Sequence, residues 1–220
     1  MIIGLTGKNC SGKDTVAQYL QKKGFHVLSL SDVIRDELAT EGGMITRETL
    51  IDKANKMRTE QGAGILAKKV MERMDKSRHY AISSIRNPEE VNELKKLEDF
   101  KLVCIKSDEK TRFERMKKRA RERDPQTFEA FMHIESAELA NKDKNKQQLE
   151  SVIKMSDEQI ENNGSLKLLY ESMDLILAKF SSEFKPTRPT WDQYFMDIAK
   201  VISSRSNCMR KNIAPALCVP

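Results

Sequence analysis

The segment GKNCSGK, residues 7–13, constrains this chain more than any other feature because it has the spacing G-x-x-x-x-G-K. It follows a short apolar run over residues 1–7, and it precedes a helix pattern over residues 14–23 that ends at Gly24. Glycines let backbone N–H groups turn inward, while the helix N-terminus and Lys13 add positive charge. We therefore predict a P-loop that binds the phosphates of a nucleotide. The predicted contact residues are Gly7, Lys8, Asn9, Cys10, Ser11, Gly12, Lys13, Asp14 and Thr15.

The residue after Lys13 departs from the usual pattern. A P-loop lysine is normally followed by Ser or Thr, whose hydroxyl ligates Mg²⁺, but here Asp14 follows and Thr15 comes next. A carboxylate beside a triphosphate is repulsive unless a cation lies between them. Either Asp14 joins the magnesium shell, or it turns away and Thr15 serves the phosphates. The expected cofactors are ATP and Mg²⁺, and the two candidate metal ligands are Asp14 and Thr15.

Strand patterns alternate with helix patterns along most of the chain. The expected strands cover residues 1–7, 25–30, 79–85, 101–106 and 158–163. The expected helices cover residues 14–23, 31–40 with Ser31 as the cap, 46–61, a segment after Gly64, a segment opened by Asn87, a basic segment that follows the strand at 101–106, much of 124–150, and 165–180. Such alternation implies crossover connections and a parallel sheet covered on both faces. We therefore predict an α/β protein with the three-layer P-loop NTPase fold and a five-stranded parallel sheet.

The pattern changes near the C-terminus. Residues 184–190 contain two prolines and are typical of a linker. Residues 191–204 form one more amphipathic helix pattern, which predicts a helical C-terminal tail. The predicted organisation is a domain at 1–183, the linker at 184–190 and a separate segment at 191–220.

Most of the net charge of +6 is concentrated in one segment. Residues 106–123 contain nine basic and four acidic side chains. This composition is compatible with nucleic-acid binding, with a solvated helix face, or with an arginine-rich flap over a polyphosphate. Aromatic side chains that could stack on bases are not interleaved with the basic ones, so nucleic acid ranks last. Arg115, Arg119 and Arg123 recur every four residues and share one helix face, which favours a lid that closes on ATP.

Other features limit where the protein acts. No apolar run approaches the ~20 residues that span a bilayer, and the N-terminus is not a signal peptide. Four cysteines are scattered through the sequence. We therefore expect a reduced, cytoplasmic protein without a membrane partner. The expected partner is a nucleotide substrate or effector, and the sequence leaves a homo-oligomer open.

Several sequence blocks resemble one known group of kinases. GLTGKNCSGKDTVAQYL resembles the opening of dephospho-coenzyme A kinases and related nucleoside monophosphate kinase-like proteins. SLSDVIRDEL, SSIRNPEEV, TRFERMKKRARERDPQTF and ENNGSL resemble later blocks of the same group, in the same order. The resemblance covers about residues 1–180 and implies phosphoryl transfer from ATP to a nucleoside monophosphate or a similar small acceptor.

The kinase resemblance also implies roles for individual residues. Asp32 would lie near the attacking hydroxyl and accept its proton, although it is equally compatible with a helix-start acid beside Ser31. The implied catalytic residues are Lys13, Asp32, Arg115 and Arg119. The implied substrate-binding arginines are Arg35, Arg58, Arg86 and Arg123. Arg86 is the strongest of these because it follows a parallel strand, whereas Arg35 and Arg58 are also compatible with the surface. Asn163 and Gly164 would lie beside the adenine.

The C-terminal segment resembles a different family. RPTWDQYFMDIAKVISSRSNCMR, residues 188–210, resembles the opening of deoxycytidylate deaminase domains, and some members of that family carry a kinase-like P-loop domain ahead of the deaminase. The P-C-x-x-C motif of a zinc deaminase does not occur, so we expect no deamination by this chain. Residues 191–220 are thus interpreted as the truncated start of such a domain. Cys208 would then be a free thiol rather than a metal ligand.

The sequence at the end of the third expected strand does not decide whether the protein transfers phosphoryl groups. Ser83 and Ser84 stand where related folds place an acid that orients Mg²⁺. Serine can hold a metal-bound water but supplies no charge. The alternative to a kinase is therefore a regulatory, nucleotide-sensing module of a deoxycytidylate deaminase with little or no phosphoryl transfer.

Overall fold

The computed structural model describes residues 1–42, 45–75, 77–119, 125, 127–139, 148–183 and 191–203. The chain divides into two compact units, Met1–Phe180 and Ser181–Pro220. The first unit contains the whole sheet and the glycine-rich segment. The predicted domain boundary after residue 183 stays a prediction.

The first unit is built on a five-stranded, all-parallel sheet, which confirms the predicted fold class. The strands are β1 (Ile2–Thr6), β2 (His26–Ser29), β3 (Tyr80–Ser83), β4 (Phe100–Lys106) and β5 (Glu158–Glu161). Their order across the sheet is β2-β3-β1-β4-β5, so β1 is central. Gly4 pairs with Ile82 on one side and with Leu102 on the other. Because β1 is central, it delivers the glycine-rich segment to the middle of the carboxyl edge.

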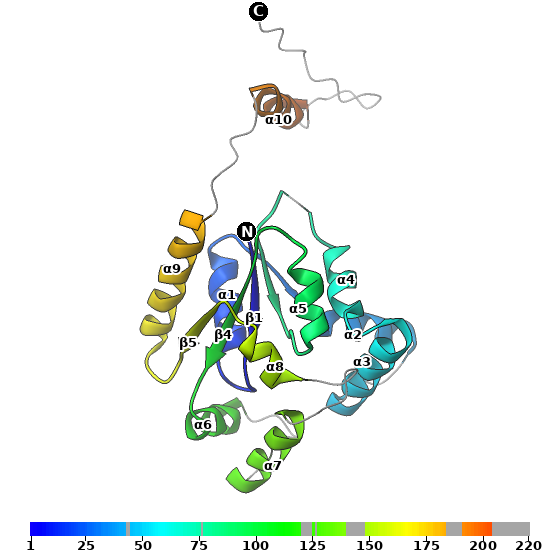
Figure 1. Cartoon of the computed structure of the whole chain (residues 1–220), viewed down its shortest axis with the longest axis vertical. Coiled ribbons are helices and arrows are strands. Elements are labelled where there is room, and N and C mark those ends of the chain that lie inside the picture. Colours follow the sequence, from blue (N-terminus) through cyan, green and yellow to red (C-terminus); the bar gives the residue numbers. More distant parts are fainter. Residues whose placement is uncertain are drawn as a thin grey trace, which may run out of the picture. The chain divides into compact units, whose positions relative to one another are not determined.

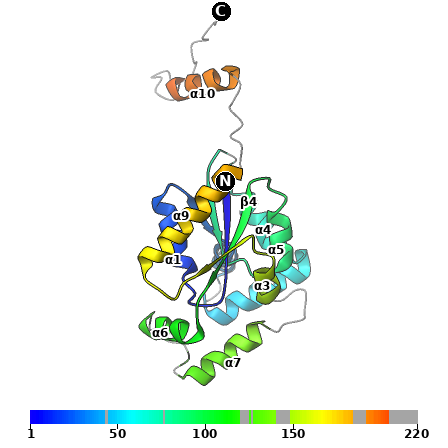
Figure 2. The same cartoon turned by 60° about the vertical axis from the view of Figure 1, so that its left-hand side comes forward.

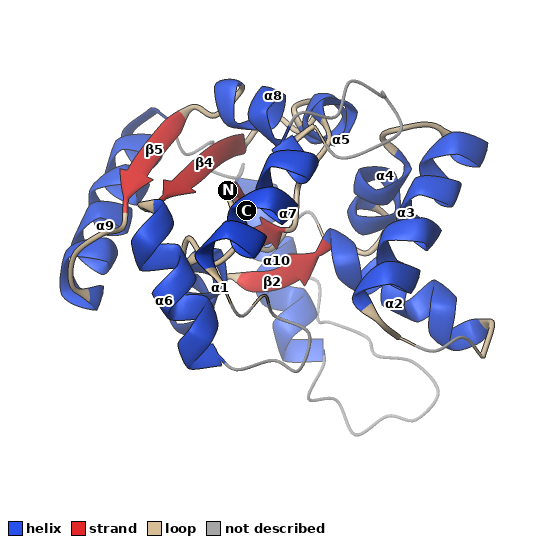
Figure 3. Cartoon of the chain, turned by 90° about the horizontal axis from the view of Figure 1, so that it is seen from below, coloured by secondary structure: helices blue, strands red, loops and turns tan. Residues whose placement is uncertain are grey.

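Helices cover both faces of the sheet. The helices of the first unit are α1 (Lys13–Lys22), α2 (Leu30–Thr40), α3 (Arg47–Gln61), α4 (Ile65–Met71), α5 (Pro88–Leu94), α6 (Glu109–Arg119), α7 (Phe128–Leu139), α8 (Leu149–Lys154) and α9 (Leu166–Glu183), whose last three residues belong to the second unit. The second unit also contains α10 (Trp191–Ser203). Helices α1 and α9 lie on one face of the sheet, and α4 and α5 lie on the other (Figures 1 and 2). Helices α6 and α7 lie beyond the carboxyl edge. Figure 3 looks onto this edge and shows α2, α3 and α4 grouped on one side, with β5 and α9 on the other.

Apolar strand residues form the core, as a sheet covered on both faces requires. Ile3, Leu5, Leu102 and Val103 are fully buried. Cys104 is also fully buried and has a free thiol, as its place in a strand predicts. Burial raises the pKa of this thiol to about 11, so Cys104 is an inert core residue.

The start of α2 differs from the sequence-based expectation. Helix α2 begins at Leu30 and is capped by Ser29, not Ser31, because β2 ends one residue earlier than expected and the Ser29 side chain accepts a hydrogen bond from the Ser31 N–H. The basic helix expected after residue 106 begins at Glu109 and is described as far as Arg119. Within the stretch 124–150, the described residues include α7 and the start of α8.

The second unit is described only in its helix α10, which is amphipathic as expected. Residues 184–190 and 204–220 lie outside the described parts, and so do Cys208 and much of the deaminase-like segment. Across the described residues, no helix combines the length and the apolar character that a membrane span requires.

Candidate functional site

The glycine-rich segment forms a tight loop between β1 and α1. Gly7 and Gly12 have positive φ angles of 137° and 106°. A Cβ atom would lie 2.2 Å from the Ile105 carbonyl oxygen at Gly7, and 2.3 Å from the Asn162 side-chain nitrogen at Gly12. At Gly7 the contact is with the backbone and leaves no space for a side chain, whereas at Gly12 the Asn162 side chain would have to shift from its hydrogen bond to the Ser11 carbonyl. The positive φ angles favour glycine at both positions.

Asn162 anchors the loop. The sequence-based predictions named its neighbours Asn163 and Gly164 but not Asn162 itself. It is buried, and its side-chain N–H donates to the Ser11 carbonyl at 2.7 Å. Asn163 is exposed, and its Oδ1 accepts hydrogen bonds from the Ser107 hydroxyl and the Asp108 N–H. Asn163 thus holds the end of β4, and Gly164 follows it. The predicted adenine contacts of Asn163 and Gly164 stay predictions.

Lys13 folds back over the loop that it follows. Its Nζ donates to the Gly7 carbonyl at 2.8 Å and to the Lys8 carbonyl at 2.7 Å. Burial lowers the pKa of Lys13, and the nearby Arg86 cation acts in the same direction, so that the pKa falls to about 8. A negatively charged ligand beside the Lys13 ammonium would offset both the cost of burying this charge and the repulsion from Arg86.

This depressed pKa predicts that nucleotide affinity falls as pH rises above about 8. A bound triphosphate raises the lysine pKa, so above the free-protein pKa each binding event must take up a proton, and affinity falls by up to about tenfold per pH unit. Isothermal titration calorimetry with ATP from about pH 7 to 9.5 would measure the profile. Lys13→Arg, which stays charged, should give a flat profile. A wild-type affinity that is independent of pH would contradict the prediction.

A single cavity of about 1290 Å³ adjoins the loop at the carboxyl edge of the sheet. It brings together residues that lie far apart in the sequence. The predicted site residues that line it are Asn9, Cys10, Gly12, Lys13, Asp14, Thr15, Asp32, Arg35, Arg58, Arg86, Arg115 and Arg119. Arg123 lies outside the described residues.

Three serines form the part of the cavity between β2 and β3. The Ser29 hydroxyl donates to the Ser84 hydroxyl at 2.9 Å and lies 2.8 Å from the Ser31 hydroxyl. Ser84 has a φ of +65°, which is strained for a residue other than glycine. Arg35 donates to both the Ser31 hydroxyl and the Asp32 carboxylate. This part of the site therefore carries hydroxyl groups where related folds place an acid that orients Mg²⁺. The one carboxylate of this group, Asp32, is about half exposed and forms an ion pair with Arg35.

Helices α2, α3 and α4 form an apolar wall of the same cavity. Ile34, Leu50, Ile51, Ala54 and Leu66 line it. Arg58 belongs to this wall and is only 3% exposed, so the alternative of a surface position is wrong for Arg58. It forms an ion pair with Glu90 of α5, which is fully buried. Sequence reasoning indicated Glu90 only as an acid in the first turn of a helix.

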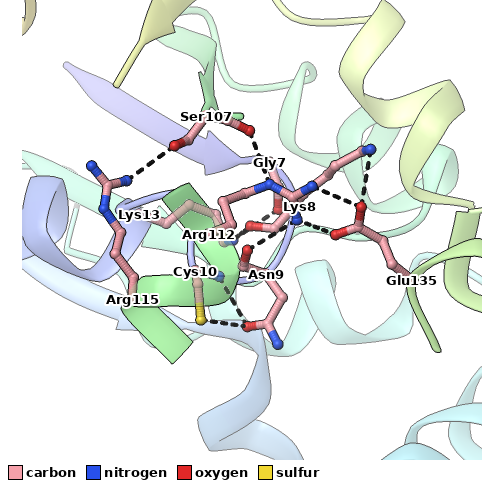
Figure 4. A network of polar contacts seen from close by, with 9 residues as sticks. All are labelled: Gly7, Lys8, Asn9, Cys10, Lys13, Ser107, Arg112, Arg115 and Glu135. Atoms are coloured by element: carbon pink, nitrogen blue, oxygen red, sulfur yellow. Dashed lines mark hydrogen bonds and ion pairs between the residues drawn. The ribbon is translucent and has the colours of Figure 1, made fainter. Parts of the chain in front are cut away.

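A second buried network lies on the other side of the loop (Figure 4). Arg112 of α6 is fully buried and pairs through two guanidinium nitrogens with Glu135 of α7. Its Nε also donates to the Ser107 carbonyl at 2.9 Å. Lys8 donates to Glu135 at 3.1 Å, which ties α7 directly to the phosphate loop.

The Arg112 network fixes the helix that carries the predicted lid arginines. Arg115 donates to the Asn162 carbonyl at 2.9 Å and to the Ser107 hydroxyl at 3.2 Å. Arg115 and Arg119 line the cavity from α6. Arg112 lies three residues before Arg115 on the same face of α6, so its bonds to Glu135 and Ser107 hold in place the helix face that carries Arg115 and Arg119.

The loop has the properties that an anionic ligand requires. The first N–H groups of α1 have no partner within the helix, and Lys13 and Arg86 supply charge. Asp14 and Thr15 offer the hard oxygen ligands that Mg²⁺ prefers, from the same side of the cavity. Among the described residues, no group of three or more His, Cys, Asp or Glu side chains is arranged so that it could hold a metal ion.

Comparisons with known proteins agree with this geometry. The sequence model of the AAA domain family AAA_18 matches residues 3–141. A UPF0200 protein of Pyrococcus abyssi is 34% identical over 186 residues, which cover 81% of this chain and 96% of that protein. A UPF0200 protein of Methanothermobacter thermautotrophicus is 32% identical over 186 residues and covers 83% and 92% of the two chains.

Two solved structures are similar in fold. TT1252 from Thermus thermophilus aligns with a TM-score of 0.53 at 21% identity, over 81% of this chain and 97% of that one. Shikimate kinase from Aquifex aeolicus aligns with a TM-score of 0.52 at 16% identity, over 82% and 98%. These likenesses show a P-loop kinase fold.

Proposed function

The chain belongs to the AAA domain family AAA_18, and we propose that it is a phosphotransferase of the nucleotide kinase type. In this proposal it transfers a phosphoryl group from ATP to a nucleoside monophosphate or a similar small phosphorylated acceptor. The observation that carries the proposal is that the cavity beside the phosphate loop is also lined by Arg35 and Arg86, which come from other segments of the chain. Two guanidinium groups in addition to Lys13 can hold the phosphate of an acceptor beside the phosphates of ATP.

Each group has a role that follows from its position. Lys13 and the N-terminus of α1 hold the outer phosphates of ATP. Arg86 and Arg35 hold the acceptor phosphate, since guanidinium groups match phosphate oxygens. Arg115 and Arg119 face the same space from α6 and stabilise the negative charge that spreads over the transferring phosphoryl group.

Two further roles concern the attacking oxygen and the metal. Asp32 lies in the first turn of α2, where it orients the attacking oxygen and takes its proton when that oxygen carries one. Mg²⁺, held by Asp14 or Thr15 together with the phosphates, would neutralise charge on ATP.

The test is ADP release from ATP in the presence of Mg²⁺ and a panel of nucleoside and deoxynucleoside monophosphates. We expect release that depends on an acceptor and is absent with ATP alone. A thermal-shift series with the same nucleotides should show stabilisation by ATP and by the preferred acceptor, since a ligand stabilises what it binds. ATP binding without acceptor-dependent ADP release would contradict the kinase proposal.

That contradictory result would favour a second function, a nucleotide-sensing module. The observations that motivate it are the hydroxyls of Ser83 and Ser84 at the end of β3, where an acid was sought, and the separate unit that follows residue 180. In this reading the deaminase-like segment belongs to the protein that the module regulates. Changing Lys13 in such a complete deaminase should then alter the nucleotide response of deamination.

A further inference from the structure

Arg58 lies in the apolar wall of the cavity, and its buried ion pair with Glu90 leaves one guanidinium nitrogen of Arg58 without a hydrogen-bond partner among the described residues. Glu90 Oε1 accepts from Arg58 Nε at 3.1 Å and from Nη2 at 2.8 Å. Glu90 Oε2 accepts from the backbone N–H groups of Arg86 at 2.8 Å and Asn87 at 3.0 Å. Both carboxylate oxygens are thus occupied, and the same carboxylate joins α3 to the loop that carries Arg86.

The remaining nitrogen of Arg58, Nη1, is buried and has no hydrogen-bond partner among the described residues. A buried N–H group without a partner is costly, and native structures rarely retain one without a reason. Arg58 lines the cavity beside Leu50 and Ala54. We propose that Arg58 Nη1 is a specificity contact that donates a hydrogen bond to a keto oxygen on the ring of the acceptor. This inference rests on the proposed function and names the class of acceptor within it.

The charge and the surroundings of Arg58 decide which chemistry it recognises. Its positive charge is balanced by Glu90, so it selects a neutral oxygen rather than a second phosphate. Its neighbours Leu50, Ile51 and Leu66 are apolar and suit the faces of a flat ring. Because Glu90 has no lone pair facing the cavity to spare, an amino group placed there would meet a second donor. The site therefore favours bases with a keto group over bases with an amino group at the same position.

Matched nucleotide pairs test this directly. UMP and CMP differ by a keto or an amino group on the same ring, and GMP and AMP provide a purine comparison. Isothermal titration of the intact chain with each monophosphate should give at least about tenfold tighter binding of the keto member in one pair. Arg58→Lys keeps a cation for Glu90 but removes the Nη1 donor. It should bring the keto and amino affinities within about threefold while ATP binding is retained.

Arg73→Lys is the matched control, because Arg73 pairs with Asp36 on the exposed side of α2, outside the cavity lining. It should keep the wild-type preference. If Arg58→Lys fails to fold, Arg58→Met combined with Glu90→Gln retains an oxygen for the Arg86 and Asn87 N–H groups and should likewise lose the preference.

Two results would overturn the inference. One is equal wild-type affinity for the members of both pairs, and the other is a preference that survives in Arg58→Lys. ADP release with keto and amino acceptors at the same rate would leave the phosphotransferase proposal standing and remove the Arg58 assignment alone. Absence of ADP release with any acceptor, together with keto-selective binding, would remove the kinase proposal and leave the Arg58 contact in place.

Discussion

Replacing Lys13 with alanine is expected to lower the kcat/KM of ADP release by at least about a hundredfold. The Lys13 ammonium lies between the Gly7 and Lys8 carbonyls at the N-terminus of α1, beside the cavity that we assign to the phosphates. Its charge is worth more there than at the surface, because the site is shielded from water and Arg86 already disfavours a free cation. The loss should appear in both nucleotide affinity and turnover, measured by calorimetry and by coupled ADP detection.

The matched control for this prediction is Lys22→Ala. Lys22 lies in the last turn of the same helix, is exposed, and is absent from the cavity lining. It should retain activity within about twofold, which corresponds to less than 0.5 kcal/mol in the barrier. A thermal melt without nucleotide checks that Lys13→Ala still folds. A folded Lys13→Ala protein with wild-type activity would show that the glycine-rich loop does not hold the phosphates of ATP.

The sheet and the phosphate loop were predictable because their signals are local. An apolar run followed by G-x-x-x-x-G-K fixes β1, the loop and the start of α1 within a single short segment. Alternation of strands and helices then limits the topology to a parallel, three-layer fold. The cap of α2 was misplaced by two residues because Ser29 and Ser31 are both suitable caps. Only the end of β2 decides between them, and that end depends on pairing with β3.

The partners within the site were not predictable because they pair across long stretches of sequence. Arg58 and Glu90 lie 32 residues apart, and Asn162 lies 151 residues from Ser11. An arginine beside a P-loop has many acceptable partners, and helix periodicity does not say which carboxylate it meets. The sequence thus indicated candidate arginines for the site. Only the folded structure shows that Arg58 forms a buried ion pair with Glu90 and that Arg86 lies near enough to Lys13 to lower its pKa.

Removing the carboxylate of Glu135 should destabilise the first unit by about 3–5 kcal/mol. The fully buried Arg112 would lose its ion-pair partner, and Lys8 would lose the carboxylate that accepts its hydrogen bond. Urea unfolding of Glu135→Ala would measure the loss, which for a unit of this size corresponds to a fall in Tm on the order of 10 °C. Glu129→Ala is the control, because Glu129 lies exposed in the first turn of the same helix and contributes less than about 1 kcal/mol.

The pH dependence of stability distinguishes the loss of the Glu135 charge from the loss of its packing. Burial raises the pKa of Glu135, but hydrogen bonds from Arg112 and Lys8 lower it more, so the net shift is downward. A carboxylate with a depressed folded-state pKa contributes stability above its unfolded pKa and loses it as pH falls through the folded value. Wild type should therefore lose stability on acidification more steeply than Glu135→Ala.

A double variant completes the test of the Arg112 network. Arg112→Met combined with Glu135→Leu removes both buried charges together and should recover most of the stability that Glu135→Ala loses, since the penalty comes from an unpaired buried charge. Phosphoryl transfer should not recover with it, because Arg112 also ties α6 to the Ser107 and Asn9 carbonyls and so sets the direction of Arg115. If the double variant regained full activity along with stability, Arg112 would be needed only to balance Glu135 and the lid would orient without it.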